Sequence, residues 1–282
     1  MEPSFARSVW RVLETVHAVT YFAPESLEAN RALGLRGYWM GYFAGRSAPL
    51  GEASPAVVSA AFFNFRPSMV RRALPDAWSY ASPAAVLDAR TAAASAALRR
   101  IAPAAGAVAA EALTLLRPVV EAADGGGRPL FGANRDLPEP SDPVGALWQA
   151  ATTLREHRGD GHVALLVAEG LDGCEAHVLF AAAEGVPVEV LRDNRGWSPQ
   201  EWKAAADRLA SRGLLTGTGE PTSAGRALRE RVESRTDELA LVPYRVLGDG
   251  ECLLDLVARP AREVARSGQI PFPNPMGLRP PN

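Results

Sequence analysis

The chemically most versatile side chains of this chain lie close together, because three of its four histidines fall within twenty-one residues. Imidazole titrates near neutrality and a carboxylate can fix its tautomer, so such a set can act as a general base or bind a divalent metal. The spacing differs from the one-face helical pair of H-E-x-x-H, and we therefore assign no metal ligands. The candidate catalytic residues are His157, Asp160, His162 and His177, with Glu156 nearby.

The same stretch also has a structural interpretation, because Gly159 and Gly161 flank Asp160. Glycine is unfavourable inside a helix, so we expect a helix to break at this point and to resume from Val163. Asp160 would then cap the second helix, and His162 would hydrogen-bond locally. Both interpretations stay open from the sequence.

Aromatic residues are concentrated at the start of the chain, where residues 1–80 hold thirteen of the twenty. They can wall an apolar pocket for a ring-containing metabolite, with phenol, imidazole and guanidinium groups orienting the ligand. Ordinary core packing of the aromatics, and helix capping or ion pairing of the arginines, are the alternatives. The candidate ligand-binding residues are His17, Tyr21, Tyr38, Tyr42, Arg46, Phe62, Asn64 and Arg66.

Other catalytic patterns are missing from the sequence. There is no G-x-S-x-G elbow, and neither Cys174 nor Cys252 has a base beside it. The glycines at 125–127 lack the Lys-Ser/Thr of a phosphate loop, so we interpret them as a hinge. The cysteines form no disulfide framework, which favours buried thiols in a reducing compartment. The sequence therefore names no cofactor.

The elements that would position these residues are helices. Asp172 can cap a helix that runs to Gly185, and a second short helix follows at 188–193. Ser198-Pro199-Gln200-Glu201 has the pattern of a helix start with a capping box, and this helix ends at Gly213. Residues 214–221, which include Gly217, Gly219 and Pro221, lead from this helix to the next one.

The phrase "RLASRGLLTGTGEPTSAGRALRERVE" resembles the last third of a MarR-type winged-helix regulator, and the resemblance covers residues 172–233. It implies a recognition helix whose DNA-facing side chains would be Gln200, Lys203 and Arg208, and after it a two-strand wing with minimal β structure. The wing at 217–221 has no basic residue, although a DNA-reading wing is expected to present positive charge. DNA binding is therefore an alternative that we do not favour.

Landmarks of residues 10–134 recur in the same order in residues 148–274, such as Trp10 against Trp148 and Arg117-Pro118 against Arg259-Pro260. This pattern predicts a tandem duplication of two winged-helix-like halves that form a pseudo-dimer within one chain. In the first half we expect helices at 37–45, 55–63 and 70–78, with a degenerate wing. The expected domains are 1–123 and 143–282, separated by a Gly/Pro-rich interdomain loop at 124–142, with a proline-rich tail that stays non-helical.

Taken whole, the chain resembles actinobacterial SalK-like, helix-turn-helix-containing proteins. The phrases that carry this resemblance are "GRSAPLG", "FFNFRPSMVRRALPDAW", "LREHRGDGH" and "RGWSPQEW". It implies the fold and a bacterial setting but no catalytic residues. Composition agrees, since 282 residues with 47% hydrophobic content can form two packed domains. The net charge of −2 lacks the basic excess of a duplex-binding protein.

The sequence has no apolar run long enough to cross a membrane and no leader pattern, so we expect a cytoplasmic protein without a membrane partner. The favoured function is binding of an apolar or aromatic small molecule between helices, in sensing or secondary metabolism. A MarR-like transcription regulator and an enzyme that uses the region His157–His177 are the alternatives. A duplicated chain satisfies its own dimer interface, so a monomer and a homodimer are both open.

Overall fold

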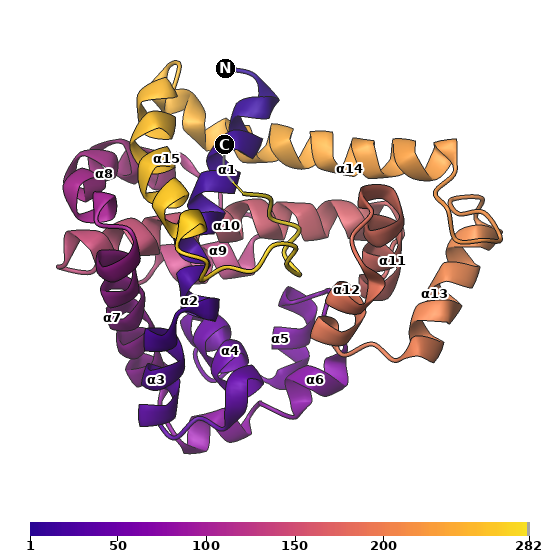
Figure 1. Ribbon diagram of the computed structural model, residues 1–282, viewed down its shortest axis with the longest axis horizontal. Helices are drawn as coiled ribbons and strands as arrows, with labels where there is room; N and C mark the ends of the chain where they lie inside the picture. The colour runs from indigo at the N-terminus through magenta and orange to yellow at the C-terminus, as the bar shows by residue number, and fades with distance from the viewer. Residues whose placement is uncertain (281–282) are drawn as a thin grey trace.

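The computed structural model describes residues 1–280, and within them the chain is almost entirely helical (Figure 1). This confirms the predicted mainly α class. The elements in chain order are α1 (Pro3–His17), α2 (Val19–Phe22), α3 (Pro24–Ala32), α4 (Gly37–Ser47), η1 (Ala48–Leu50), α5 (Pro55–Ala61), α6 (Pro67–Arg71), η2 (Asp76–Ser79), α7 (Pro83–Ile101), α8 (Ala104–Ala122), α9 (Pro129–Arg135), α10 (Pro143–Ala168), α11 (Gly173–Glu184), α12 (Val188–Arg195), α13 (Pro199–Ser211), α14 (Ser223–Leu241), η3 (Val242–Leu247) and α15 (Glu251–Arg266).

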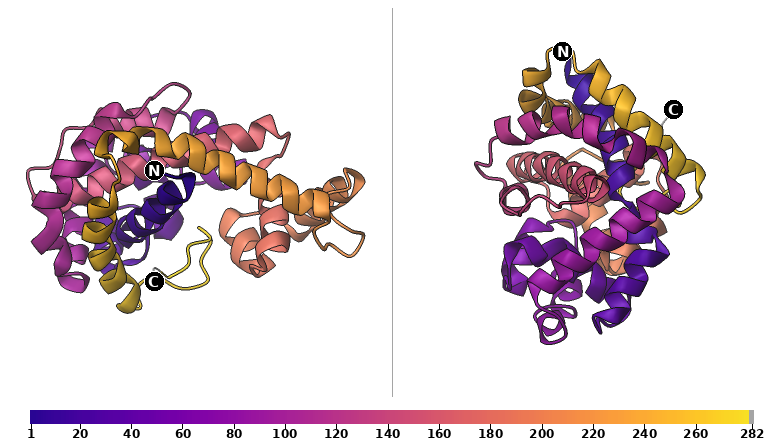
Figure 2. Two further views of the ribbon diagram at one scale, coloured as in Figure 1. Left: turned by 90° about the horizontal axis from the view of Figure 1, so that it is seen from above. Right: turned by 90° about the vertical axis from the view of Figure 1, so that its left-hand side faces the viewer.

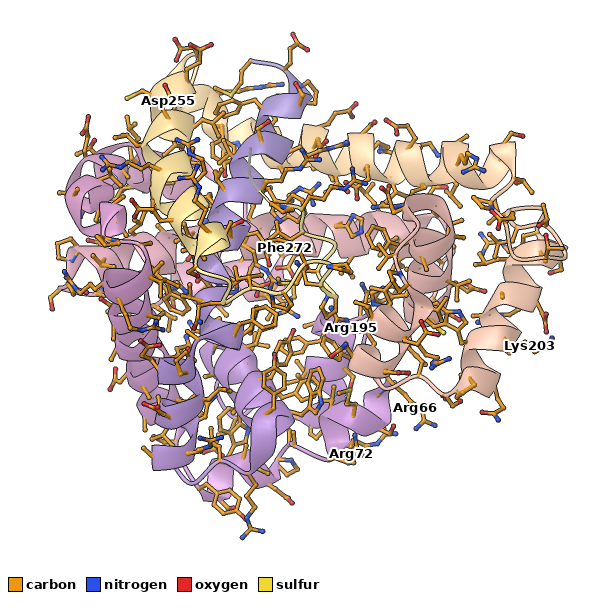
Figure 3. The ribbon with its side chains drawn as sticks, viewed as in Figure 1. Arg66, Arg72, Arg195, Lys203, Asp255 and Phe272 are labelled. Carbon is orange, nitrogen blue, oxygen red and sulfur yellow. The ribbon has the colours of Figure 1, made fainter. Side chains whose placement is uncertain are left out.

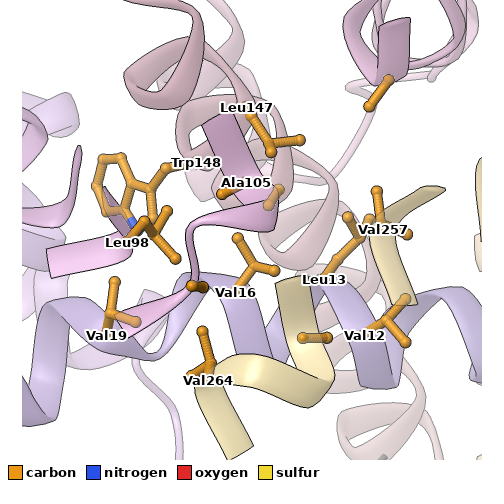
Figure 4. Packing of buried hydrophobic residues seen from close by; sticks show 14 of the residues in the cluster. Val12, Leu13, Val16, Val19, Leu98, Ala105, Leu147, Trp148, Val257 and Val264 are labelled. Carbon is orange, nitrogen blue, oxygen red and sulfur yellow. The ribbon is translucent and has the colours of Figure 1, made fainter. Parts of the chain in front are cut away.

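Helices α1, α8, α10 and α15 pack together as a central bundle (Figures 1 and 4). Their apolar faces share one core, in which Leu13, Leu116, Trp148 and Val257 are buried. The indole N–H of Trp148 donates to the carbonyl of His17 at 3.1 Å. The largest side chain of the bundle is therefore buried without an unpaired donor, as buried tryptophan requires.

Two smaller lobes are attached to the bundle, each with a core of its own. The first lobe comprises α3 to α7 and packs around Phe43, Phe62 and Phe65. The second lobe comprises α11 to α13 with the start of α14 and packs around Leu191 and Leu209. Figure 2 shows the second lobe at the far ends of α10 and α14, which carry it away from the bundle.

Helix starts in the second lobe follow the predicted capping chemistry. The Asp172 carboxylate accepts the backbone N–H groups of Cys174 and Glu175, and the Glu175 side chain accepts the N–H of Asp172. Ser198 and Glu201 form the same reciprocal pair at α13. These side chains satisfy amides that have no partner inside the helix. The wing is reduced to an isolated antiparallel bridge at 215 and 221, and no strand forms in residues 1–280.

The predicted break at Gly159 and Gly161 is wrong, because α10 runs without interruption from Pro143 to Ala168. Each glycine weakens a helix by about 1 kcal/mol, which tertiary packing can outweigh. Helix α10 packs against α1, α7, α8, α9 and α14 and buries side chains along its whole length. Asp160 therefore caps no second helix; its carboxylate accepts the backbone N–H of Phe131 at 2.9 Å.

Two further expectations need correction. The segment 124–142 is not a plain loop, because α9 occupies seven of its residues and buries Leu130 and Phe131. In the first lobe the helix expected over 70–78 is divided into α6 and η2, since Pro75 lacks the N–H that a continuing helix needs. The tail, residues 267–280, forms no helix, as its prolines predict. None of the helices in the described part of the chain is long and apolar enough to span a bilayer.

Candidate functional site

A cavity of about 720 Å³ lies where the bundle, both lobes and the tail meet. Helices α1 and α10 form its bundle wall, and residues 61–65 contribute the wall of the first lobe. Helices α11 and α14 close the side of the second lobe, and residues 272–280 of the tail run along the remaining side (Figure 3). Its size is that of a pocket for a drug-sized molecule.

Ion pairs cover the bundle wall of the cavity. Arg46 binds both carboxylate oxygens of Glu156, each at 3.1 Å. Arg155 contacts Glu156 at 2.7 Å and Glu14 at 3.0 Å, and both carboxylates are buried. Burial alone would raise the pKa of Glu156, but Arg155 and Arg46 outweigh it and hold that pKa well below the usual range. Glu156 is therefore ionised and joins the first lobe to the bundle.

A second group of ion pairs ties α1 and α10 to α14. Arg158 donates to Glu233 at 3.2 Å and to Asp237 at 2.9 Å. Arg7 contacts Asp237 at 2.6 Å, and Arg229 contacts Glu233 at 2.7 Å. Burial opposes ionisation of Glu233, but Arg229, together with His162 and Arg158, lowers its pKa to about 2. The arginines of this wall are thus neutralised by carboxylates of the protein.

The predicted residues His17 and Tyr21 belong to a buried network beside the cavity. The hydroxyl of Thr152 donates to the carbonyl of Trp148 at 2.8 Å, so it accepts from Nδ1 of His17, also at 2.8 Å. His17 is neutral, since burial lowers its pKa, and its Nε2 therefore accepts from the Tyr21 hydroxyl at 2.9 Å. Tyr21, Tyr38, Tyr42 and Arg46 surround a small hollow next to this network.

The predicted ligand-binding residues are thus divided between two adjoining spaces. Phe62 and Asn64 line the large cavity, and His17, Tyr21 and Tyr38 line the small hollow. Tyr42 and Arg46 line both, because they stand between the two spaces. Arg66 lies outside both, on the contact between the lobes.

The four candidate catalytic residues do not form one cluster. Asp160, His162 and His177 line the cavity, whereas His157 packs edge-on against Phe131 with ring centroids 4.9 Å apart. Burial lowers the pKa of His162 to about 4 and raises that of Asp160 to about 7. His162 contacts the Thr236 hydroxyl through Nδ1 at 2.9 Å. Within residues 1–280, no group of three or more His, Cys, Asp or Glu side chains is placed to hold a metal ion.

Several polar groups that line the cavity have no partner within residues 1–280. The Nε2 atom of His177, the Oδ1 atom of Asn64 and the Nε atom of Arg195 are all buried without a hydrogen bond. His177 is only 6% exposed. Buried polar atoms are nearly always hydrogen-bonded, so this set marks a place where the protein's own contacts are incomplete.

The two lobes touch directly along a seam below the cavity. The backbone N–H of Arg66 donates to the carbonyl of Arg195 at 2.9 Å, and its guanidinium contacts Glu201 at 2.7 Å. The indole N–H of Trp197 donates to the carbonyl of Asn64 at 3.1 Å. Figure 3 shows Arg66 at this junction, close to α6 and the start of α13. The phrases "FFNFRPSMV" and "RGWSPQEW", far apart in sequence, therefore meet at this seam.

The second lobe contains a helix-turn-helix arrangement. Helix α12 ends in a glycine turn at Gly196 with φ of 75°, and α13 begins three residues later on its capping box. The reduced wing follows, and α14 returns to the bundle. A family model described as a helix-turn-helix family matches residues 6–271. The chain belongs to this helix-turn-helix family. Searches of curated proteins and of solved structures found no match.

In this helix-turn-helix protein, the two basic side chains expected to face DNA are paired with carboxylates. On α13, Lys203 pairs with Asp207 at 2.7 Å, and Arg208 contacts Asp172 and Glu175. Figure 3 shows Lys203 on the outer side of that helix. Gln200 lies exposed at the first turn. These ion pairs reduce the positive charge that α13 can offer to phosphates.

Sequence reasoning missed the arginines of the cavity and the tail. Arg155 and Arg158 stand three residues apart on α10 among the candidate histidines, and Arg195 ends α12. One available signal was the phrase "LREHRGDGH", in which basic and acidic side chains repeat at helical spacing. The tail gave no such signal, because its contacts depend on the tertiary fold.

Proposed function

We propose that this protein binds an apolar or aromatic small molecule in its central cavity, in a sensing or secondary-metabolism role. The observation that carries the proposal is the cavity itself, which has the volume of a ligand pocket and contains buried polar atoms without partners. Aromatic side chains supply apolar walls from both lobes, among them Phe62, Phe65 and Phe180. A bound molecule would complete the missing hydrogen bonds.

We also propose that the molecule is an internally duplicated pseudo-dimer of winged-helix-like halves. In support, α1 and α10 share the landmarks Trp10 and Trp148 and pack against each other. Helices α8 and α15 contain the sequence landmarks Pro118 and Pro260 and also pack together. The helix order α4, α5, α6 of the first lobe parallels α11, α12, α13 of the second. The cavity would then lie on the pseudo-twofold interface.

Native mass spectrometry of freshly purified protein tests the proposal, since a bound molecule adds a mass that denaturation removes. A matched pair of variants locates it. Ala61→Trp places an indole in the cavity wall, whereas Ala60→Trp adds the same group at an exposed position on the same helix. We expect the first variant to lose the added mass and the second to keep it. Equal retention by both variants would place the molecule elsewhere.

The alternative of a MarR-like transcription regulator is favoured by the family match. Two features oppose standard duplex reading. Helix α6, the counterpart of α13, has only five residues, and the seam holds the lobes together where two readers would enter successive major grooves. A regulator requires duplex affinity that falls steeply with salt, so binding to mixed duplex at 50 and 200 mM salt distinguishes the two functions.

An enzyme in this region would have to use Asp160, His162 and His177, because His157 lies outside the cavity. If replacing each of these three residues abolishes a chemical conversion without lowering stability, the enzyme alternative is supported. Unchanged turnover in all three would remove this alternative.

A further inference from the structure

Most arginines of the cavity are neutralised by carboxylates of the protein. Glu14 and Glu156 form ion pairs with Arg46 and Arg155. Glu233 and Asp237 form ion pairs with the arginines on the side of α14. Arg279 of the tail contacts Glu184, and Arg11 is exposed to solvent. These side chains need no further anion.

Arg195 is different, because it has no carboxylate partner anywhere in residues 1–280. Its guanidinium donates only to two backbone carbonyls, that of Pro275 at 2.8 Å and that of Asn194 at 3.3 Å. It stacks over the ring of Phe65 with 4.5 Å between its central carbon and the ring centroid. Its Nε atom is buried and unpaired. A half-buried positive charge without a counter-ion is costly, and a bound anion would offset that cost.

The surroundings of Arg195 are already arranged for such an anion. The tail carbonyl and the Phe65 ring fix the guanidinium, so little side-chain freedom would be lost on binding. Figure 3 shows Arg195 at the gap between the lobes, beside the tail.

His177 provides a second, independent sign of a ligand. Its imidazole is 6% exposed, lines the cavity and has no hydrogen-bond partner within the described residues. Burial, and then the positive charge of Arg195, holds the pKa of His177 well below its usual range. His177 is therefore neutral, and it can donate one hydrogen bond to an anion held nearby by Arg195.

We propose that the molecule bound in this cavity is a ring-containing, largely apolar acid whose single oxyanion group is held by Arg195, with His177 as a neutral donor. One unpaired guanidinium matches one negative charge, and the aromatic walls match the rest of the molecule. The shared chemistry is a monoanionic carboxylate or sulfonate. This inference rests on the proposed function, because it assigns a ligand class to the same cavity.

Two commercial probes with the same ring skeleton test the charge directly. 8-Anilinonaphthalene-1-sulfonate is an apolar monoanion, and N-phenyl-1-naphthylamine lacks only the sulfonate. Both become fluorescent in apolar sites, and calorimetry gives their stoichiometry. We expect the full-length protein to bind one molecule of the sulfonate at least about tenfold more tightly than the neutral amine.

Variants test whether Arg195 causes the preference for the sulfonate over the neutral amine. Arg195→Gln should weaken sulfonate binding by about tenfold or more and leave amine binding within about twofold, which also shows that the variant is folded. Arg192→Gln is the matched control, since Arg192 lies on the same helix, pairs with Asp193 and does not line the cavity. It should change neither affinity. Arg195→Lys retains the charge and should keep part of the preference for the sulfonate.

The position of His177 gives a readout that does not depend on affinity. In NMR titrations, the imidazole pKa of His177 should rise when the sulfonate binds and should also rise in ligand-free Arg195→Gln, because a nearby positive charge is balanced or removed. If both probes bind the wild type equally and Arg195→Gln has no effect, the acid assignment is wrong while binding in the cavity stands. If neither probe binds protein whose cavity native mass spectrometry shows to be empty, the proposed function itself is contradicted.

Discussion

Glu156 is the counter-ion of two arginines on the bundle wall, because both Arg46 and Arg155 pair with it. Glu156→Gln keeps the shape of the side chain but leaves two guanidiniums short of a counter-charge. Removing one member of a buried ion pair costs about 3–5 kcal/mol, so we expect a loss of that size in the free energy of unfolding. Urea denaturation at pH 7 measures it.

Glu139→Gln is the matched control, since Glu139 also binds an arginine through both oxygens but lies half exposed. An exposed pair contributes about 0–1 kcal/mol, so this variant should stay close to wild type. Equal losses in the two variants would show that Glu156 does not balance the buried arginines.

The histidines make the fold sensitive to acid. Burial lowers the pKa of His157 and His162 to about 4. Between pH 6.5 and 4 the unfolded chain therefore binds protons that the folded chain does not, and the free energy of unfolding falls as the pH falls. Each such histidine contributes a loss of about 2 kcal/mol between pH 7 and 5. Asp160 acts in the opposite direction, because burial raises its pKa to about 7 and the folded state takes up that proton first.

His162→Gln tests this pH dependence at one residue, because glutamine cannot take up the proton. We expect the decrease in the free energy of unfolding between pH 7 and 5 to be about 2 kcal/mol smaller in the variant than in the wild type. Urea denaturation at the two pH values gives the difference. A variant that loses stability as steeply as the wild type would show that His162 is not kept neutral by the fold.

At the scale of the elements, the continuity of α10 makes Gly159 a weak point in an otherwise well-packed helix. A Cβ at this position would meet only the carboxylate of Glu156, at an ordinary 3.7 Å. Gly159→Ala should therefore raise the free energy of unfolding by about 0.5–1 kcal/mol. Gly185→Ala should lower it, because Gly185 ends α11 with φ of 67°. Thermal and urea denaturation compare the two; a loss in Gly159→Ala would contradict the helical geometry.

The elements divide into those that local sequence determines and those that tertiary contacts determine. Asp172 and Ser198 predicted the starts of α11 and α13, because capping is a local hydrogen-bonding pattern. The glycines of α10 led to a wrong prediction, because their local cost is outweighed by packing on five neighbouring helices. Arg195 could not be recognised from sequence, because its importance lies in a missing partner, which only the fold reveals.

The candidate site shows the same division. The sequence pointed to aromatics with nearby polar groups, and the structure places seven of the eight predicted ligand-binding residues around two adjoining spaces. Arg66 was selected by the same reasoning but lies at the seam, because its charge pairs with Glu201 of the other lobe. Residue type alone cannot separate these two uses of an arginine.

At the scale of the whole molecule, the seam between the lobes depends on Gly173. A Cβ there would come within 2.2 Å of the backbone oxygen of Phe63, so the lobes could not keep their present approach. Gly173→Ala should lower the free energy of unfolding by about 1–3 kcal/mol and speed hydrogen exchange in α11. Gly217→Ala is the control, since nothing lies within 4 Å of a Cβ at that position, and it should stay within about 0.5 kcal/mol of wild type. Unchanged exchange in Gly173→Ala would mean that the seam does not hold the lobes.

The tail that runs along the cavity affects the rate at which a bound molecule is released. Its turn is held by Asn274, which is 1% exposed and bonds to Pro271 and Leu278, and Arg195 holds the carbonyl of Pro275. A molecule that leaves past the tail must wait until this segment detaches. Its release is then timed by local opening of the protein, and a competitor in solution does not hasten it. An occupant that this segment retains would accordingly persist through chromatography, and unfolding and refolding the chain would then empty the cavity.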